Sequence, residues 1–399
     1  MRPKVLIMYG GLPHYYNPIL EQLNHHYELV ALVPDETSLT FGAGVHQNYN
    51  VRFRVIRVKE FKTYYNKVFV RDMARILREE KPAIILSGVS FALGFSLYPA
   101  VKWALSRYRV KLCIKAIPFR EPMAQEAIKH YYKVDLAKKT NPNTFNRLFS
   151  YLKAIAFTQA LGFAYRSADF YVVYTAAGKA IYGSYGVHED KIFVIYNSPD
   201  TDAIFATKAK ISKEIVQHNP YQILHVGRLV AWKRVDLLLE AVAKLRLDLP
   251  ELRLVVVGDG PEKENLVVQS EKLGITDVVR FEGAIYDAEI LGRAFSSASL
   301  YVLAGMGGLS INEAMAYGLP VICSVCDGTE KDLVRDGYNG YIFEDGQLDS
   351  LTHAIYQVMS NPDNRQRMAD NSLRIIREEI NIHRVVGEYL KAFSSALKA

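Results

Sequence analysis

The stretch that decides the fold is residues 301–320, which read YVLAGMGGLSINEAMAYGLP. A short apolar run at 301–303 predicts a buried strand, and the glycine-rich segment 305–308 predicts a turn. An amphipathic helix is then predicted to begin at Leu309 or Ser310, and the closing Gly-Leu-Pro ends it. Because a strand, a glycine turn and a helix N-terminus together present backbone N–H groups and the positive end of a helix dipole, this stretch suits a bound phosphate.

Glu313 lies about one turn inside this predicted helix. A carboxylate at that point repels phosphate, but it can accept hydrogen bonds from sugar hydroxyls. The sequence therefore predicts a nucleotide-sugar site, with phosphate bound by backbone amides and a sugar by Glu313. The amides concerned are those of Gly307, Gly308, Leu309 and Ser310.

Each half of the chain opens in a similar way. Residues 4–9 are an apolar strand followed by Gly10-Gly11, and residues 222–226 are a second such strand followed by Gly227. Further apolar runs alternate with helical patterns at 83–87, 110–117, 170–174, 192–195, 253–257, 278–281, 299–303, 320–324 and 340–343. Such alternation predicts an α/β chain of two doubly wound domains with parallel sheets, and ligands are expected where the strand carboxyl ends face the cleft between them.

The domain boundary is expected in the polar stretch 201–220. We assign residues 1–203 to a first domain and residues 204–380 to a second, and residues 381–399 form a final helical segment. A chain of 399 residues is too long for one ordinary core, which agrees with two domains of similar size.

The composition is that of a soluble globular protein, with 50% hydrophobic and 23% charged residues. The net charge of +7 is uneven, because residues 51–150 carry 21 basic and 7 acidic side chains. Three cysteines are too few for a disulfide scaffold, and no second pair accompanies the C-x-x-C spacing of Cys323 and Cys326, so we expect no metal site. The beginning of the sequence lacks a signal-peptide core, and no apolar stretch approaches the ~20 residues that span a bilayer.

Two cations flank the loop after the strand at 222–226. Arg228 follows the strand end and Lys233 precedes the next helix, so both can point into the cleft and neutralise a diphosphate, unless the loop is simply solvated. The backbone of Ala284 and Ile285, beyond another strand end, can line a nucleobase pocket.

Between about Gln222 and Gly346 the chain resembles the retaining glycosyltransferases of family four, which have the GT-B fold. The segments that carry the resemblance are VGRLVAWKRVDLLLEA, LVVVGDGP, VRFEG, GLSINEAMAYGLPVI and DGYNGYIF. They cover roughly a third of the chain. The first 160 residues match only in outline, which is expected of an acceptor-binding domain, and the resemblance also implies that a helix at 383–397 packs back on that domain.

The resemblance implies roles for individual residues. Arg228 and Lys233 match the diphosphate-binding pair, and Glu313 matches the second glutamate of an E-x7-E motif, which holds the ribose. Gly11 and Gly227 are further donor-binding candidates. The first glutamate of the motif is replaced by Gly305, where we expect only backbone and open space to face the donor sugar.

The first domain lacks the histidine that relatives carry after a middle strand. His14, just past the Gly10-Gly11 turn, is the alternative polar group for catalysis, although a histidine in such a loop is often only a surface residue. Arg120 and Glu121 are acceptor-side candidates, and they can equally pair with each other.

The basic first half has several interpretations. Residues 129–153 mix cations with aromatic side chains and run into an apolar helix at 147–165, which suits an anionic membrane surface. Alternatively, residues 154–165 are a core helix and the charges form a solvated face. Nucleic acid is a third possibility, but no recognisable binding module supports it, so we expect none.

The sequence therefore predicts a retaining hexosyl- or N-acetylhexosaminyltransferase that moves a sugar from a nucleotide diphosphate to a hydroxyl of a glycan or lipid-linked saccharide. The family's chemistry implies that the leaving phosphate oxygen accepts the proton, so neither metal nor cofactor is expected. The family also implies polysaccharide or lipopolysaccharide biosynthesis in the cytoplasm, on the inner face of the cell membrane. Two alternatives remain open: a catalytically weak sugar-binding relative, and a nicotinamide dehydrogenase, for which neither half shows G-x-G-x-x-G after its first strand.

Overall fold

The apolar runs of the sequence form parallel strands in the computed structural model, which describes residues 2–36, 46–62, 65, 67–117, 121–140, 143–213, 216–325 and 328–398. The chain divides into two units. The first comprises Met1–Tyr196 and His383–Ala399, and the second comprises Asn197–Ile382.

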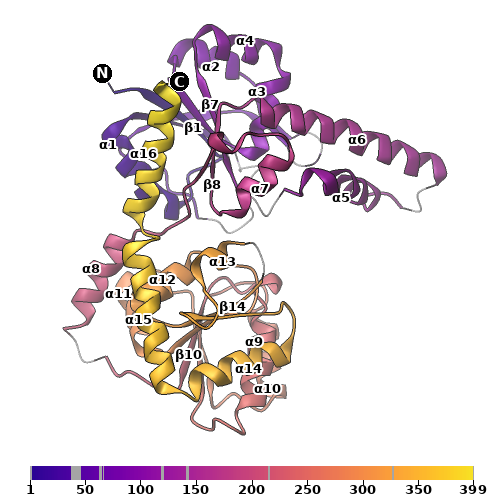
Figure 1. Cartoon of the computed structure of the whole chain (residues 1–399). Helices are drawn as coiled ribbons and strands as arrows, with labels where there is room; N and C mark the ends of the chain where they lie inside the picture. The colour runs from indigo at the N-terminus through magenta and orange to yellow at the C-terminus, as the bar shows by residue number, and fades with distance from the viewer. Residues whose placement is uncertain are drawn as a thin grey trace. The chain divides into compact units, whose positions relative to one another are not determined.

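The first unit is built on a parallel sheet with strand order β3-β2-β1-β6-β7-β8-β9, of which Figure 1 labels β1, β7 and β8. Its strands are β1 (Lys4–Met8), β2 (Glu28–Pro34), β3 (Arg54–Val58), β6 (Ile84–Gly88), β7 (Lys111–Ala116), β8 (Phe170–Val173) and β9 (Ile192–Val194). A separate antiparallel pair joins β4 (Glu60–Lys62) and β5 (Val68–Val70). The helices are α1 (Asn17–His26), α2 (Met73–Glu80), α3 (Ala92–Leu97), α4 (Pro99–Arg107), α5 (Ala124–Leu136), α6 (Thr144–Arg166), α7 (Ala177–Ser184) and most of α16 (Ile382–Lys398).

Strand β1 shows why these apolar runs become central strands. Leu6 and Met8 enter the core cluster on one face of the sheet, while Val5 and Ile7, which alternate with them, are equally buried on the other face. A strand covered on both faces needs apolar residues at successive positions, which is how this run reads. The predicted strands at 83–87, 110–117, 170–174 and 192–195 are found within one or two residues, whereas β2 and β3 were not predicted.

Helix α16 packs against the first unit through aromatic side chains. The hydroxyl of Tyr389 is hydrogen-bonded to that of Tyr16. The ring of Phe393 meets the rings of Tyr27 and Phe170 edge to face, at centroid distances of 5.3 and 6.1 Å. These contacts join the last residues of the chain to strands and helices more than 200 positions earlier.

The second unit has the parallel strand order β12-β11-β10-β13-β14-β15. Its strands are β10 (Gln222–Val226), β11 (Arg253–Val257), β12 (Val279–Gly283), β13 (Leu300–Leu303), β14 (Val321–Ser324) and β15 (Gly340–Phe343). Its helices are α8 (Thr201–Ile211), α9 (Val235–Leu245), α10 (Lys263–Lys272), α11 (Ala288–Ser297), α12 (Ser310–Tyr317), α13 (Thr329–Leu333), α14 (Leu348–Met359) and α15 (Pro362–Glu378). Because α9 packs with α10 and α14 while α12 packs with α8, α11 and α15, helices cover both faces, and the predicted α/β fold of two doubly wound sheets is confirmed.

The stretch 201–220, where we expected the domain boundary, is partly helical and lies within the second unit. Its first eleven residues form helix α8, which belongs to the second unit and packs on α11 and α12. Asp200 starts the helix by accepting a hydrogen bond from the N–H of Ala203. Lys208 ties the helix to α12, since its ammonium donates to the carbonyl of Tyr317 at 2.8 Å. The units divide between Tyr196 and Asn197, seven residues before the expected boundary.

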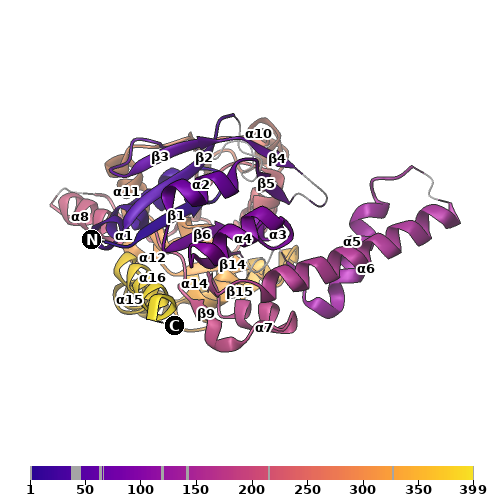
Figure 2. The ribbon, with the colours of Figure 1, turned by 90° about the horizontal axis from the view of Figure 1, so that it is seen from above.

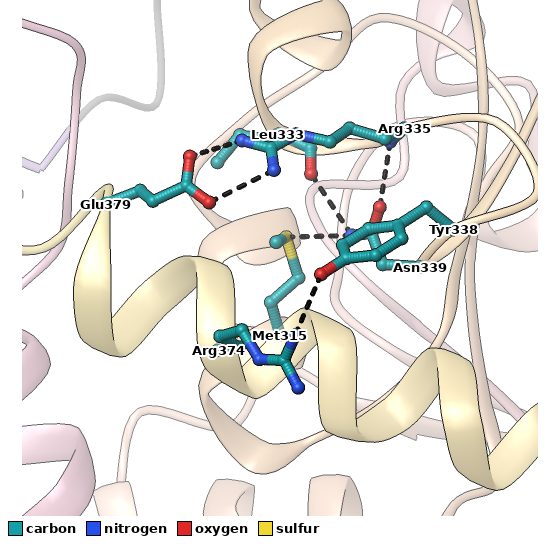
Figure 3. A network of polar contacts seen from close by, with 7 residues as sticks. All are labelled: Met315, Leu333, Arg335, Tyr338, Asn339, Arg374 and Glu379. Carbon is teal, nitrogen blue, oxygen red and sulfur yellow. Dashed lines mark hydrogen bonds and ion pairs between the residues drawn. The ribbon is translucent and has the colours of Figure 1, made fainter.

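Asn339 holds the loop before β15 against helix α12 (Figure 3). This fully buried amide donates to the carbonyl of Leu333 at 3.1 Å and accepts from the N–H of Arg335 at 2.8 Å. Its nitrogen also lies 4.0 Å from the sulfur of Met315 on α12. Around this centre lie the ion pair of Arg335 with Glu379 and the contact of Arg374 with the Tyr338 hydroxyl.

We expect Asn339→Ala to lower the free energy of unfolding by about 2–3 kcal/mol, because it leaves a buried carbonyl and a buried N–H without partners. Arg374→Ala is the matched control within the same network, since it removes only an exposed contact and should cost less than about 0.5 kcal/mol. Urea unfolding followed by circular dichroism measures both values. Equal stability of the two variants would show that the buried amide does not fix this loop.

Within the described part of the chain, no helix combines the length and the apolar character that crossing a membrane requires.

Candidate functional site

The glycine turn and the helix after it are placed as the sequence predicts. Strand β13 ends at Leu303, helix α12 begins at Ser310, and Gly318 caps its end in the left-handed region at φ +82°. Among the described residues, the N–H groups of Gly308, Leu309 and Ser310 have no hydrogen-bond acceptor. A helix N-terminus in this state can bind a phosphate through three adjacent amides.

Lys233 meets the glycine turn directly. It ends a short 3-10 turn at Ala231–Lys233, and its ammonium donates to the carbonyls of Met306 at 2.7 Å and Gly307 at 2.8 Å. The N–H of Met306 in turn donates to the carbonyl of Trp232 at 2.8 Å. The loop after β10 and the turn after β13 therefore form one structure, with a cation beside the free amides of α12.

Gly305 is required by this close approach. A Cβ atom added there would lie 2.2 Å from the carbonyl oxygen of Trp232 and 2.7 Å from the carbonyl carbon of Lys233. Both are backbone atoms, so no side chain can be accommodated without moving the loop. The expectation of open space at Gly305 is therefore wrong, because the backbone of Trp232 and Lys233 occupies it.

Arg228 lies at the carboxyl end of β10, half-buried, with its guanidinium carbon 5.4 Å from the centre of the Trp232 ring. Its neighbour Gly227 donates its N–H to Val257 at the end of β11. Arg228, Gly227 and Lys233 thus share one short loop at the strand ends of the second sheet. This arrangement places two cations where a diphosphate would need them.

Glu313 is a half-buried carboxyl group on the first turn of α12. Burial raises its pKa from 4.5 to about 7. Within the described residues its carboxylate accepts no hydrogen bond. Partial desolvation of a carboxyl group without a donor carries a cost, which a ligand that brings hydroxyl groups would reduce.

Ala284 and Ile285 follow β12, which is the edge strand of the second sheet. They lie at the same carboxyl edge as the glycine turn, but β10 and β11 separate them from β13. Ala284 is exposed and Ile285 half-buried. Their role against a nucleobase stays a prediction.

His225 was not predicted as part of this region, although it stands in the quoted strand before Gly227. Its ring is fully buried, and its Nδ1 lies 3.0 Å from the carbonyl oxygen of Val302. Burial, aided by the positive charge of Lys233, lowers its pKa to about 4, so the ring is neutral at pH 7. Its Nε2 has no hydrogen-bond partner among the residues that the structure describes, and it lies 3.5 Å from the position that a Cβ on Gly227 would take. A histidine inside an apolar strand was the available signal.

His14 and Gly11 lie in the first unit, after β1. Gly10 adopts φ +81°, which explains why glycine begins this turn. The His14 side chain is exposed, and its Nδ1 lies 3.2 Å from the carbonyl oxygen of His46. The structure therefore holds His14 against a neighbouring loop, and its catalytic role stays a prediction.

Lys115 is a second polar group that the sequence analysis did not name. It lies near the carboxyl end of β7, is 93% buried, and has its ammonium 3.1 Å from the centre of the Tyr16 ring. The rings of Tyr9 and Tyr174, at the ends of β1 and β8, lie 4.3 and 4.9 Å away. Burial lowers its pKa well below the ordinary value. The sequence was sufficient to predict that Lys115 lies in a strand. That three tyrosine rings surround its ammonium follows only from the folded structure.

Glu121 is buried in the first unit rather than exposed to an acceptor. It accepts hydrogen bonds from the ammonium of Lys67 at 2.8 Å and from the hydroxyls of Tyr131 and Tyr165 at 3.0 and 2.9 Å. These bonds join the base of α5 and α6 to the strand pair β4-β5. Arg120, the predicted partner of Glu121, lies outside the described residues, as does Cys326.

A cavity of about 720 Å³ opens elsewhere in the first unit, among residues such as Ala83, Lys111 and Asp169. These residues stand at the amino ends of β6, β7 and β8. Because ligands of doubly wound sheets bind at the carboxyl ends, this cavity is on the wrong edge for the predicted chemistry.

Comparisons with known proteins agree with this geometry. Residues 207–374 match the family model described as glycosyl transferases group 1. An uncharacterized glycosyltransferase of Haemophilus influenzae is 31% identical over 42% of this chain and 47% of its own length. The lipopolysaccharide core biosynthesis glycosyltransferase LpsE of Rhizobium meliloti is 29% identical over 43% of this chain and 49% of its own length. The chain thus spans about half the length of these curated relatives.

A solved structure of HepE from Anabaena, in complex with UDP, matches 99% of this chain and 100% of its own with a TM-score of 0.69 at 18% identity. At that identity the likeness shows the fold alone, which is GT-B. Residues 207–374 are thus similar to the group 1 glycosyl transferases, and the two doubly wound units of the chain have the GT-B fold.

Proposed function

We propose that this chain transfers a sugar from a nucleotide diphosphate sugar to an acceptor hydroxyl, with retention at the anomeric carbon. One observation carries the proposal: Glu313, a half-buried carboxyl group that accepts no hydrogen bond within the described residues, stands one turn inside a helix whose first amides also lack described partners. A nucleoside diphosphate satisfies both, because its ribose hydroxyls can donate to Glu313 and its phosphates can accept from the amides.

The residues of the glycine turn and its neighbouring loop would then stabilise the departing diphosphate. Negative charge develops on the leaving phosphate oxygen, and Arg228, Lys233 and the N-terminus of α12 supply positive charge beside it. That oxygen can take the proton of the acceptor hydroxyl, so the transfer needs no separate base. We also propose that no metal takes part, since these cations can neutralise the diphosphate.

We propose a hexose or N-acetylhexosamine as the transferred sugar, and a glycan or lipid-linked saccharide as the acceptor. The relative named for lipopolysaccharide core biosynthesis supports this class of acceptor. The UDP in the HepE structure makes uridine diphosphate sugars the first donors to test. The corresponding place of action is the cytoplasm, at the inner face of the cell membrane.

Calorimetric titration separates this proposal from a nicotinamide-binding alternative. We expect UDP to bind at least tenfold more tightly than UMP, because the second phosphate reaches the amides of α12 and the cations beside them. NAD should bind more weakly than UDP. Binding of NAD alone, or equal affinity for UMP and UDP, would contradict a diphosphate site at this turn.

Glu313 should make the binding of UDP depend on pH. Its pKa of about 7 means that the free protein is mostly protonated there at pH 6 and mostly ionised at pH 8. Since only the ionised group accepts both ribose hydrogen bonds, affinity should rise by about tenfold over this interval. Glu313→Gln should remove most of this pH dependence, whereas a dependence caused by titration of the phosphate would remain. At pH 8 the variant should lose roughly 1.5–3 kcal/mol of binding free energy for UDP.

The stability of the free protein should change with pH in the opposite direction. A carboxyl group whose pKa is raised by folding destabilises the folded state once it ionises, so its penalty grows as pH rises from about 4.5 through 7. Glu313→Gln should therefore be more stable than the original chain at pH 8 in the absence of ligand. If the variant binds UDP undiminished and shows the same pH profile, Glu313 does not hold the ribose.

A further inference from the structure

The helical pair α5–α6 projects from the first unit, as both views show (Figures 1 and 2). The two helices pack against each other through Tyr131 and Phe157, whose rings meet edge to face at 4.8 Å, and through the ion pair of Lys153 with Asp135 at 2.6 Å. The far half of α6, residues 144–152, lies beyond the part of the helix that α3 and the sheet cover.

The far half of α6 exposes large apolar side chains along one stripe. Phe145, Leu148, Phe149 and Leu152 follow the spacing of one helical face and are exposed by 73, 57, 56 and 55%. Phe145 and Phe149 stack on each other with planes 11° apart. Tyr151, beside the stripe, is 46% exposed. A contiguous apolar surface of this kind marks a site of contact with another apolar surface.

The opposite face of the same helix is a core face. Ala154, Thr158, Leu161 and Tyr165 are buried and pack in the first unit. The alternative that residues 154–165 form a core helix is therefore confirmed, and the membrane alternative stays a prediction. Residues 154–165 contribute to the core, whereas the stripe at 145–152 does not.

Exposed cations stand on the same pair of helices, and the ammonium of Lys139 lies 5.7 Å from the centre of the Phe149 ring. Lys129, Lys133 and Lys138 are exposed on α5 and the turn after it, and Arg147 is exposed on α6. The acidic residues do not balance them. Asp135 is buried and forms ion pairs with Lys153 and, at 3.3 Å, with Lys139. Among the described residues of 124–153, Glu126 is then the one exposed acidic side chain.

This combination of charge and apolar surface favours an anionic lipid surface over a second copy of the chain as the binding partner. A second copy of the chain would bring the same lysines together and would be opposed by their repulsion. An anionic lipid surface attracts the lysines, and its headgroup region accepts phenylalanine and leucine side chains from one face of a helix. We propose that the far half of α6, with the basic residues of α5, docks this chain on a bilayer that contains anionic lipid.

Vesicle flotation tests the proposal with the full chain. We expect recovery with vesicles of phosphatidylcholine and 30% phosphatidylglycerol, little with phosphatidylcholine alone, and weaker binding as salt rises, because exposed charges are screened over about 8 Å at physiological ionic strength. Phe149→Ser/Leu152→Ser should reduce binding at least tenfold at all salt concentrations. Lys133→Glu/Lys138→Glu should reduce it at least tenfold at low salt.

The control is Leu247→Ser, which removes an apolar side chain that is 91% exposed but stands outside the helical pair α5–α6. It should bind vesicles as the original chain does. All of these positions are exposed, so the variants should keep the circular dichroism spectrum and the thermal midpoint. A Phe149→Trp variant adds a direct signal, since its fluorescence should shift to shorter wavelength on anionic vesicles.

Three results would overturn the proposal. The first is equal recovery with neutral and anionic vesicles, or none with either. The second is flotation that Phe149→Ser/Leu152→Ser leaves unchanged. The third is a dimer of the original chain in sedimentation that the same double substitution converts to a monomer, because the stripe would then be an interface between copies.

Discussion

Replacing Arg228 or Lys233 by alanine is expected to lower kcat/KM by about 100-fold or more. Both cations stand beside the glycine turn, and their attraction to the diphosphate grows as the sugar departs, so the loss should appear mainly in kcat. Arg228→Lys should recover only part of the activity, because lysine keeps the charge without the bidentate fork. Steady-state kinetics with a nucleotide sugar donor measure these effects.

Lys233 requires an additional control, because its ammonium also bonds the carbonyls of Met306 and Gly307. Its removal can loosen the turn as well as remove charge, so circular dichroism and the thermal midpoint must accompany the kinetics. Arg246→Ala is the matched variant, since it removes an arginine of an exposed ion pair with Asp277 in the same unit and should change kcat/KM less than twofold. Kinetics within threefold of the original for both Arg228→Ala and Lys233→Ala would remove these residues from the reaction.

Substitution of Gly305 is expected to have an effect of similar size for a different reason. The Cβ of Gly305→Ala would stand 2.2 Å from the Trp232 carbonyl oxygen, so the loop that carries Lys233 must move. We expect a loss of about 1–3 kcal/mol in stability and of at least 100-fold in kcat/KM. Gly305→Glu should lose at least as much activity as Gly305→Ala, even with glucose donors. Its Cβ meets the same backbone atoms, so the added carboxylate cannot reach a bound sugar without displacing the loop.

Two other glycines calibrate this prediction. At Gly308 an added Cβ would lie 3.3 Å from the ammonium nitrogen of Lys233, which is a side-chain atom and not backbone, so alanine should have an intermediate effect. At Gly387, in helix α16, nothing lies within 4 Å, and alanine should leave activity unchanged and stability equal or slightly higher. A gain of activity for Gly305→Glu with glucose donors would show that the glycine is a missing acid and not a packing requirement.

The absence of a carboxylate at Gly305 also bears on the donor. A buried carboxylate that bonds sugar hydroxyls rejects donors that lack them. Since backbone occupies that place here, we propose that the site tolerates or prefers a deoxy or N-acetylated sugar over plain glucose. The kcat/KM values of the original chain for deoxy, N-acetylated and plain glucose donors measure this preference.

The strand pattern and the glycine turn could be predicted because they depend on local sequence. Apolar runs such as 253–257 and 321–324 are buried on both faces, and the turn at 305–308 needs only glycine and a following helix to be recognised. Strand β3 was not predicted, because as an edge strand it is partly exposed and carries Arg54 and Arg57 among its apolar residues.

Features that depend on distant segments could not be predicted. The need for glycine at 305 arises from residues 232 and 233, and the tyrosines around Lys115 come from the ends of β1 and β8 and from the 3-10 turn before α1. The exposure of the stripe on α6 likewise depends on where α5 and the sheet stop covering the helix. In each case the residues were visible in the sequence, but their neighbours were not.

The central claim is that this chain cleaves a nucleotide diphosphate sugar through Arg228 and Lys233 and keeps the anomeric configuration. The most direct measurement is turnover of a panel of uridine, guanosine, adenosine and thymidine diphosphate sugars with glycan and lipid-linked acceptors, followed by mass spectrometry and proton NMR of the product. The account predicts that one donor is consumed, that the product gains one sugar with the donor's anomeric configuration, and that Arg228→Ala abolishes the reaction. Tight binding of a nucleoside diphosphate without turnover of any donor, or a product of inverted configuration, would contradict it.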